Sequence, residues 1–441
     1  MMKALECEHN VQRIITQQEI NGVVFNKARA RFYIYVLREK QIRLYRKIRP
    51  FLSSEYTLPN KGIPVSKPFL KSGGYTAQVC KWYEDPSVVS GQFTRVEFVE
   101  PDLGSRAKLI AQLLRLGWHP QNFTIKGNPR LTVDGEPCPS LLQIDSEVGS
   151  WIASWYIYSH RESQIAGWLR KLRPDGKLTA SGITIGTPTY RFRHSIVVNV
   201  PKAASYVPFG WQMRSLFTVP RGRRLVGHDA SGLELRMLAH YINDDDFSKE
   251  VVDGDIHTKN QVAAGLPTRD AAKTFIYAFN YGAGDVKIGR IVGGGRKEGK
   301  RIKSEFLANN PKLATLIEQA QRAAGRGYLV GLDGRKIRMR RDKDSGQVQV
   351  RKALNTLLQA AGATVMKYSM IMLDEWDRIE GLDAKKVIDM HDEGQTDVAK
   401  DDAERHAELA ADSVRAAGEY LQLNVPLAGE AKIGLNWAQT H

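Results

Sequence analysis

The stretch of residues 267–284, PTRDAAKTFIYAFNYGAG, constrains the fold more strongly than any other part of the chain. Thr268 can cap the start of a helix, and the proline before it fits that position. The residues that recur at every fourth position of this helix are Arg269, Lys273, Tyr277 and Tyr281. Because four residues turn a helix by about 400°, these side chains form one slightly slanted stripe. A surface helix would separate cations from aromatic side chains, so the stripe predicts a helix that faces a ligand.

The composition of the stripe indicates the kind of ligand. Arginine and lysine one turn apart, near the positive N-terminus of a helix, suit the terminal phosphates of a polyanion. An aromatic ring further along the stripe can stack on a sugar and a base. The spacing therefore favours a nucleoside triphosphate. The alternative is an ordinary surface helix whose cations pair with neighbouring acids.

The charge balance of the chain also indicates an anionic partner. The 441 residues include 64 lysines and arginines against 48 acids, which gives a formal charge of +16. Nucleic acid is the first candidate because it offers many phosphate contacts, and a basic but otherwise ordinary enzyme is the alternative. The hydrophobic content of 42% is normal for a packed globular protein.

The cysteines and the apolar segments predict a cytoplasmic protein. Cys7, Cys80 and Cys138 are widely separated and form no CxxC pair, which predicts neither a disulfide framework nor a zinc site. No apolar run approaches the roughly 20 residues that span a bilayer, and the N-terminus lacks the pattern of a signal peptide. We therefore expect a protein of the reducing cytoplasm that has no membrane contact.

Two acidic residues occupy positions where carboxylates could bind hard cations. Asp229 follows the strand-like segment LVGH and precedes a helical pattern, whereas Asp392 lies at the turn of the expected hairpin VIDMHDEGQTDV. The alternatives are a helix-capping role for Asp229 and a solvated turn for Asp392. Together, the two acids could hold two divalent cations about 3.5–4 Å apart and support an in-line displacement at phosphorus.

A polar stripe recurs in the segment QVQVRKALNTLLQAAGATVMK. Its members Arg351, Asn355 and Gln359 are again spaced by four residues and carry guanidinium and amide groups. Such groups can bind minor-groove acceptors of whichever base pair is present. A polar, solvent-exposed helix face has the same pattern and remains the alternative.

The rest of the sequence predicts a mixed chain of helices and strands. Residues 4–50 are helical in pattern, residues 52–95 form a loop-rich insertion, and a helix starts after Ser105 and runs to Gly117. The elements expected after these are strands and turns over 175–201, a strand entering a helix over 223–242, helices over 268–323, a hairpin at Asp333–Gly334, a helix over 348–378, a hairpin joined at 391–393 and a helix over 400–420.

With these segments in place, the chain resembles family A DNA polymerases, the DNA polymerase I type, and is most similar to the branch carried by podovirus-type bacteriophages. Residues 229–236 match the family motif DxSxxExR, residues 269–282 match RxxxKxxx(F/Y)xxxYG, and residues 390–393 match an apolar strand followed by HDE. The segments DIHTKNQ, GLDGRK, ALNTLLQAAGA and GLNWAQTH are also similar to the phage branch. The three motifs occur in order, which makes the resemblance specific.

The resemblance implies an α+β right-hand polymerase fold. It places a thumb region at residues 1–180, with the loop-rich insertion at 52–95. It places the palm at residues 181–256 and 325–441, and the fingers at residues 257–324.

The resemblance also implies the chemistry of primer extension with deoxynucleotides by two Mg²⁺ ions, with Mn²⁺ as a substitute. Asp229, Asp392 and the Ala230 carbonyl would hold the ions, and Glu393 would support them. Lys273 would act as an acid toward the leaving pyrophosphate. The residues implied to bind the incoming dNTP are Ser231, Gly232, Leu233, Glu234, His257, Arg269, Lys273 and Tyr277. Glu234 would exclude a 2′-hydroxyl, and Tyr277 would pack against the sugar.

Contacts to primer and template follow from the resemblance as well. The residues implied are Arg191, His194, Asn199, Tyr281, Gly282, Arg351, Asn355, Gln359 and His391. The segment RFRHSIVVNVP, which carries the first three of these residues, lacks the family's PNL tripeptide. This departure puts the role of Asn199 in doubt.

Two further departures concern partners. Residues 1–180 show no cluster of acids for a proofreading site, which predicts that the 3′–5′ exonuclease is a separate protein or was removed. Residues 52–95 occupy the place where some phage relatives insert a loop that captures thioredoxin. A thioredoxin-like or other processivity factor is one reading of this segment, and a plain thumb insertion is the other.

Two rival functions remain in view. A single-subunit RNA polymerase would share both aspartates and the cationic helix, but Glu234 argues against it because an RNA polymerase must admit the 2′-hydroxyl. A catalytically inactive DNA-binding module of the same fold is the rival from another class. The presence of both aspartates and the whole stripe argues against that module.

Overall fold

The structure is a computed structural model and falls into two compact units. The residues that it describes are 2–53, 55–57, 69–82, 97–99, 101–124, 127–133, 136–144, 147–342 and 345–440. The larger unit comprises residues 1–30, 167–205 and 209–441, and the smaller comprises residues 31–166 and 206–208. The predicted boundaries of thumb, palm and fingers stay predictions, since this division does not test them.

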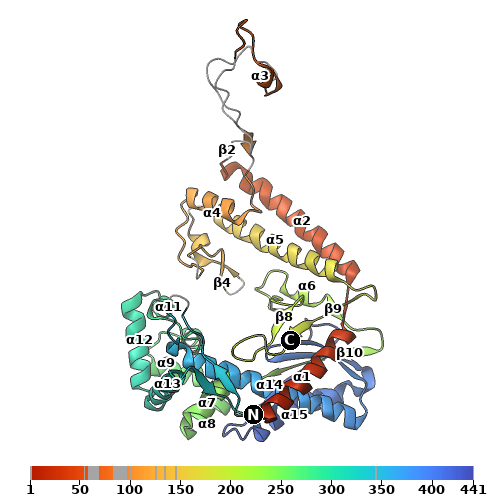
Figure 1. Cartoon of the computed structure of the whole chain (residues 1–441), viewed down its shortest axis with the longest axis vertical. Coiled ribbons are helices and arrows are strands. Elements are labelled where there is room, and N and C mark those ends of the chain that lie inside the picture. The colour runs from red at the N-terminus through yellow and green to blue at the C-terminus, as the bar shows by residue number, and fades with distance from the viewer. Residues whose placement is uncertain are drawn as a thin grey trace. The chain divides into compact units, whose positions relative to one another are not determined.

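The centre of the larger unit is a four-stranded antiparallel sheet in the order β13-β14-β10-β15. Its strands are β10 (Arg223–Ala230), β13 (Ala384–Met390), β14 (Glu393–Ala399) and β15 (Gly429–Gly434). Helix α15 (Ala403–Tyr420) packs on β10 and β15, and α1 (Met2–Asn21) packs on β13 (Figure 1). The hairpin predicted to turn at residues 391–393 is confirmed, because β13 and β14 pair on either side of it.

A group of helices follows β10 in the chain. They are α7 (Leu233–Ile242), α8 (Asp245–Val252), α9 (Ile256–Ala263), α10 (Arg269–Asn280), α11 (Asp285–Ile291), α12 (Arg296–Ala308) and α13 (Pro311–Ala324). Phe275, Phe279 and Phe306 form an aromatic cluster in their core, with ring centroids 5.0–5.7 Å apart. The predicted strand-to-helix passage over 223–242 and the helices over 268–323 are confirmed.

The long helix α14 (Ala353–Glu380) runs through the core of the larger unit and follows a 3₁₀ turn, Val350–Lys352. It therefore begins slightly later than the sequence pattern predicted. A hairpin of β11 (Tyr328–Val330) and β12 (Lys336–Arg338) precedes it. The predicted turn at Asp333–Gly334 is confirmed, and Gly334 has a φ of +79° that suits glycine.

The prediction of continuous helix over residues 4–50 is wrong at its centre. Helix α1 ends before Gly22, whose φ is +59°, and strand β1 (Val23–Phe25) precedes α2 (Lys27–Ile48). The β-branched and aromatic residues of β1 pair with β6 (Lys177–Leu178) and β9 (Phe217–Thr218). The remaining short elements of this unit are β7 (Ser181–Ile183), β8 (Arg193–Ser195), α6 (Gly210–Arg214) and the 3₁₀ turn Lys400–Asp402.

The smaller unit is mainly helical. It contains most of α2, α4 (Arg106–Arg115) and most of α5 (Val148–Lys171), around a core that includes Leu109, Leu113 and Trp118. Helix α4 begins directly after Ser105, although the Ser105 side chain caps no backbone amide. The short elements are the 3₁₀ turns Arg49–Phe51 and Pro139–Gln143, β2 (Glu55–Thr57), α3 (Ala77–Trp82), β3 (Glu97–Val99), β4 (Thr132–Val133) and β5 (Glu136–Pro137). Much of the predicted insertion over 52–95 lies outside the described residues.

Candidate active site

The two aspartates singled out in the sequence lie at the same end of the two inner strands of the central sheet, β10 and β14. Asp229 is the penultimate residue of β10 and lies opposite Glu393 on β14, and Asp392 precedes Glu393 at the β13–β14 turn. The amide of Ala230 donates a hydrogen bond to the Asp392 carbonyl, 3.3 Å away. Both aspartates are exposed. Antiparallel pairing therefore places two solvent-facing carboxylates at neighbouring positions.

The two carboxylates at this end of the sheet suit hard divalent cations. Carboxylate oxygens are the ligands that Mg²⁺ prefers, and this ion usually takes only one or two carboxylates plus waters and substrate phosphates. Within the described parts of the chain, no three His, Cys, Asp or Glu side chains converge on a ready-made metal centre. The pair would thus hold ions whose remaining ligands come from substrate, water and backbone.

Glu393 is buried, in contrast to the two aspartates. Its carboxylate accepts hydrogen bonds from Arg214 at 3.3 and 3.4 Å, from Gln395 at 2.8 Å and from the Trp437 indole. The Arg214 guanidinium lies 4.4 Å from the centre of the Trp437 ring. Burial lowers the pKa of Arg214, whereas Glu393 and Asp229 act in the opposite direction. These contacts fix the Glu393 side chain at the start of β14.

Sequence reasoning missed both Arg214 and Trp437 as partners of Glu393. Trp437 lies in the quoted C-terminal segment GLNWAQTH, but no pattern linked it to Glu393. Arg214 sits in a short helix with no recognisable motif.

Helix α10 carries the predicted stripe on its outer face. Arg269 and Lys273 are exposed, Tyr277 is half-buried, and the opposite face buries residues such as Phe275 and Phe279. The Thr268 hydroxyl accepts a hydrogen bond from the Ala271 amide at 3.1 Å, which confirms the predicted cap. The amphipathic pattern thus directs the cations outward while the apolar side chains anchor the helix.

His257 lies beside this stripe. Its ring centre is 6.2 Å from that of Tyr277, and burial, Arg269 and Lys273 lower its pKa. Arg269 also forms an ion pair with Asp255, at 2.7 Å, which sequence reasoning missed. His257 therefore adjoins the stripe at Tyr277, and the two cations lie toward the start of α10.

The hydroxyl of Tyr277 connects the stripe to the acids. Burial raises the pKa of the Tyr277 hydroxyl, and the negative charges of Glu234 and Asp392 raise it further. The stripe also contacts α7 directly, because the Tyr281 hydroxyl donates a hydrogen bond to Glu234.

Glu234 at the start of α7 is held by two neighbours. The Tyr281 hydroxyl donates a hydrogen bond to its Oε1 at 2.7 Å, and Arg191 approaches the same oxygen at 3.3 Å. Burial and this hydrogen bond raise the pKa of Tyr281 to about 12. The residue implied to read the sugar thus has a fixed orientation.

The turn between β10 and α7 brings the residues from Ser231 to Leu233 next to the acids. Gly232 has a φ of +60°, which the tight turn requires and glycine adopts freely. Ser231 donates its amide to Ala428 at 2.9 Å and its hydroxyl to Glu430 at 3.0 Å. Leu233 is buried.

Two clefts of the larger unit are lined by most of the residues predicted to contact DNA. A cleft of about 390 Å³ is lined by Arg191, Tyr281, Asn355, Gln359 and His391, among others. A second cleft of about 710 Å³ is lined by Gly282, Arg351 and Asn355, among others. The rings of His194 and His391 are 5.2 Å apart, so His194 adjoins the first cleft. Asn199 is not among the residues that line either cleft, and its φ is +49°.

Comparison with known proteins decides the family. A family model described as DNA polymerase family A matches residues 102–439. The chain belongs to this family. As a family A enzyme it is a DNA-directed DNA polymerase, and polymerases of this family generally use divalent metal ions.

Two phage proteins are similar over the whole chain. The DNA-directed DNA polymerase of Escherichia phage Phieco32 is 33% identical, over 98% of this chain and 98% of that protein. The DNA-directed DNA polymerase of Escherichia phage T7 is 34% identical, over 100% of this chain and 70% of that protein. The expected relation to phage polymerases is confirmed.

A solved structure supports the fold of this family A polymerase. The POL domain of Pol1 from M. smegmatis, in complex with DNA primer-template and dNTP, superposes with a TM-score of 0.77 at 18% identity. The likeness covers 98% of this chain and 70% of that chain. The predicted α+β polymerase fold is confirmed.

Proposed function

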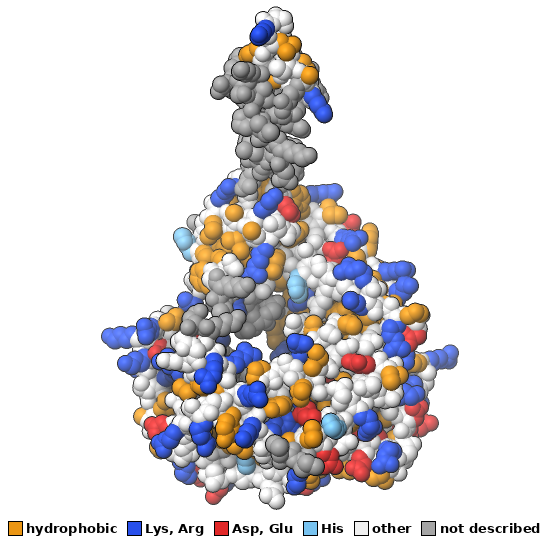
Figure 2. Space-filling model, viewed as in Figure 1, with side chains coloured by type: hydrophobic (Ala, Val, Ile, Leu, Met, Phe, Trp, Pro, Cys, Tyr) orange, Lys and Arg blue, Asp and Glu red, His pale blue; other side chains and the backbone are white. Residues whose placement is uncertain are grey.

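We propose that this family A polymerase extends a primer 3′-hydroxyl with dNTPs on a DNA template during phage DNA replication, in the cytoplasm of the bacterial host. The observation that carries the proposal is that Asp229 and Asp392 lie at the ends of neighbouring strands, while Tyr281 of the α10 stripe bonds Glu234 on the helix that follows Asp229. Lysine and arginine side chains spread over the visible surface fit a polyanionic substrate (Figure 2).

Asp229, Asp392 and the Ala230 carbonyl would hold two Mg²⁺ ions, or Mn²⁺ in their place. When bound, such ions lower the pKa of a coordinated hydroxyl and neutralise charge on attacking and leaving oxygens. Glu393, next to Asp392 in the chain, would be held in place by its hydrogen bonds from Arg214 and Trp437.

Residues of α10 and α9 would bind the triphosphate and protonate the leaving pyrophosphate. Arg269 and Lys273 are exposed near the N-terminus of α10, where the helix dipole also favours negative charge. Lys273 would donate a proton to the leaving pyrophosphate. His257, which lies beside Tyr277, would donate a hydrogen bond to a phosphate oxygen.

The sugar and base would be read by groups further along the stripe. Glu234, held by Tyr281 and Arg191, would clash with a 2′-hydroxyl, and Tyr277 would pack on the sugar. Tyr281 and Gly282 would border the templating base. The residues proposed to contact the duplex are Arg191, His194, Arg351, Asn355, Gln359 and His391.

We also expect this chain to lack proofreading by itself. A 3′–5′ exonuclease needs its own group of metal-binding acids, and the sequence of residues 1–180 shows no such cluster. The described residues likewise include no helix long and apolar enough to cross a membrane. A separate exonuclease and a processivity factor at residues 52–95 stay predictions. Magnesium-dependent removal of a mispaired primer terminus by the pure chain would contradict the expected lack of proofreading.

Extension of a primed template by the isolated chain tests the proposed function. We expect extension with dNTPs and Mg²⁺, little extension with rNTPs, and no extension by Asp392→Ala, which should still bind primer-template. Efficient rNTP use would favour an RNA polymerase. Equal extension by Asp392→Ala would eliminate the mechanism, and binding without any extension by the wild type would favour a DNA-binding module.

A further inference from the structure

The backbone of Tyr190 adopts a conformation that is unfavourable for its residue type. Its φ is +59°, in the left-handed region that a residue with a Cβ rarely adopts. Within the loop, the Tyr190 amide donates to the Thr187 carbonyl at 3.0 Å, and the Thr187 hydroxyl donates to the Arg191 carbonyl at 3.1 Å. These bonds tie the loop together but leave the Tyr190 side chain to be held from elsewhere. The next residue along the chain is Arg191, which contacts Glu234.

A buried ionic cluster lies directly beneath this loop. It joins Glu8 of α1, Asp333 and Arg335 of the β11–β12 turn, and Lys367 of α14. Lys367 donates to both Glu8 oxygens at 2.7 Å, and Arg335 donates to Asp333 at 2.6 Å. The side chains of Asp333, Arg335 and Lys367 are only 1–4% exposed. Two acids balance two bases, so the cluster carries no net charge.

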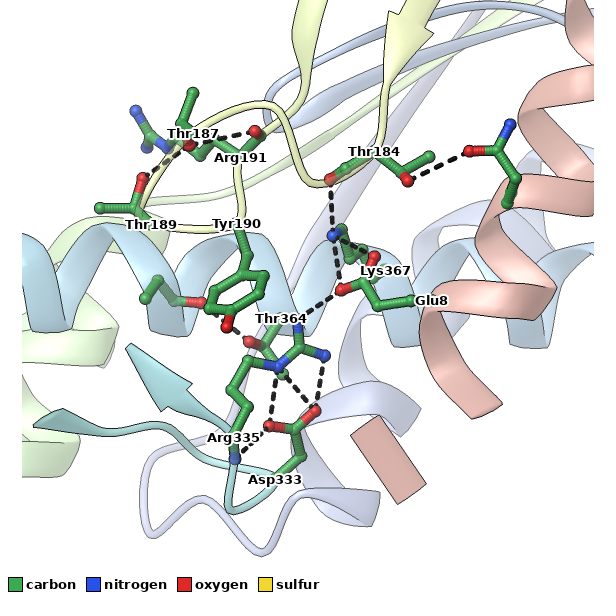
Figure 3. Close-up of polar contacts among 12 residues, drawn as sticks. Glu8, Thr184, Thr187, Thr189, Tyr190, Arg191, Asp333, Arg335, Thr364 and Lys367 are labelled. Carbon is green, nitrogen blue, oxygen red and sulfur yellow. Dashed lines mark hydrogen bonds and ion pairs between the residues drawn. The ribbon is translucent and has the colours of Figure 1, made fainter. Parts of the chain in front are cut away.

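The cluster grips the loop on both sides of Arg191. Lys367 donates to the Thr184 carbonyl at 2.8 Å, and its ammonium lies 5.3 Å from the Phe192 ring centre. The Tyr190 ring lies 4.9 Å from the Arg335 guanidinium, and its hydroxyl donates to the Lys336 carbonyl at 2.9 Å. Figure 3 shows Tyr190 pointing down to Arg335 and Lys367 lying beneath Thr184.

Such a cluster is better suited to fixing geometry than to adding stability. Buried ion pairs lose most of their attraction to desolvation, and apolar replacements are often as stable, but the pairs can specify a single arrangement. Here the arrangement includes the strained Tyr190 and the aromatic residue on the other side of Arg191. The GLDGRK segment, which matched the phage branch without a role, contributes Asp333 and Arg335.

We propose that Tyr190 and the Glu8–Asp333–Arg335–Lys367 cluster are positioning residues that hold Arg191 against Glu234 and thereby set discrimination against ribonucleotides. The cluster keeps Tyr190 in the left-handed conformation, and this conformation aims the Arg191 side chain at the Glu234 carboxylate. The inference rests on the proposed role of Glu234 in excluding a 2′-hydroxyl.

Substitutions of Tyr190 separate backbone positioning from simple loss of the ring. The measurement is the ratio of kcat/KM for dATP to that for ATP in single-nucleotide primer extension. Tyr190→Ala should lower this ratio at least roughly fivefold, because a residue with a Cβ must then hold the left-handed conformation without an anchor. Tyr190→Gly lacks the ring equally but adopts positive φ freely, so it should recover most of the ratio. Tyr190→Phe keeps the ring stack and should fall less than Tyr190→Ala. Equal ratios for the alanine and glycine variants, or an unchanged ratio for alanine, would overturn the proposal.

The cluster itself is tested by separating stability from discrimination. Lys367→Met removes the donor to Thr184 and should lower both urea stability and the dATP to ATP ratio. Adding Glu8→Gln removes the excess negative charge of the remaining Glu8–Asp333–Arg335 group, and it should restore stability but not the ratio. The matched control is His406→Asn. His406 is a buried residue of α15 whose partner, Asp377, lies on α14 ten residues after Lys367. This variant should lose stability with an unchanged ratio, and a ratio that follows stability in all variants would sink the proposal.

The variant Glu234→Ala distinguishes the two possible failures. If it leaves the dATP to ATP ratio unchanged, the role of Glu234 under the proposed function is wrong. If it lowers the ratio while Tyr190→Ala and Lys367→Met do not, only the positioning role is wrong.

Discussion

Arg269 and Asp255 form a two-point ion pair at the entrance to the site, with Nε to Oδ2 at 2.7 Å and Nη2 to Oδ1 at 3.1 Å. Asp255 also caps α9 by accepting hydrogen bonds from the amides of His257 and Thr258. Both side chains are about half exposed, at 51% and 44%, so water screens the pair. A phosphate that binds Arg269 therefore competes with Asp255.

Arg269→Ala should raise the KM for dNTPs by about 10- to 100-fold, because charge-assisted hydrogen bonds to phosphate are among the stronger ones. Asp255→Asn should instead lower the KM by about two- to threefold, since an exposed pair is weak and asparagine preserves the cap. Steady-state extension with varied dNTP measures both. A KM that rises in Asp255→Asn would show that the pair orders the site rather than competing for it.

The buried contacts of Glu393 predict a non-additive effect on stability. Arg214→Met leaves the Glu393 carboxylate buried without its guanidinium, which should lower the free energy of unfolding by about 3–5 kcal/mol. The double variant Arg214→Met with Glu393→Gln removes the unpaired charge and should regain most of this loss. Urea unfolding followed by circular dichroism measures both variants. A double variant as unstable as the single one would contradict an ion pair at this position.

His194 predicts a loss of stability at mildly acidic pH. Burial lowers the pKa of His194 from 6.5 to about 4, so between these values the unfolded chain binds a proton that the folded chain does not. Stability from this group is therefore present above pH 6.5 and is lost as the pH falls toward 4. Between pH 7 and pH 5 the wild type should lose about 2 kcal/mol more than His194→Gln. Urea unfolding at the two pH values checks this, and parallel losses in both proteins would refute it.

The three cysteines should differ in reactivity. Cys80 is exposed, whereas Cys7 and Cys138 are buried, and burial raises the pKa of the Cys7 thiol to about 11. Because the thiolate is the nucleophile, iodoacetamide at pH 8 should modify Cys80 first in the native protein and all three residues in urea. Intact-mass analysis counts the adducts, and Cys80→Ser is the control. Rapid native labelling of Cys80→Ser would contradict the burial of the other two.

The clearest successes of sequence reasoning concern local patterns. The fourth-residue stripe of α10, its Thr268 cap and the turn at Asp333–Gly334 depend on side chains within a few positions of one another. The break at Gly22 was not predicted, because the residues after it fit a helical pattern. Their pairing with β6 and β9, which makes them a strand, is visible only in the folded structure. Strand partners that lie more than a hundred residues away leave no local signal.

The site shows the same division. The sequence by itself determined which residues carry cation, acid and amide chemistry and which helix face presents them, because these depend on composition and on helical or strand periodicity. Only the tertiary structure decided that Asp229 lies opposite Glu393, that Arg214 and Trp437 support it, and that Glu8 binds Lys367 across 359 residues of chain. Those pairings arise from burial and from the packing of distant elements, which fix the positions of charged groups that no spacing in the chain relates.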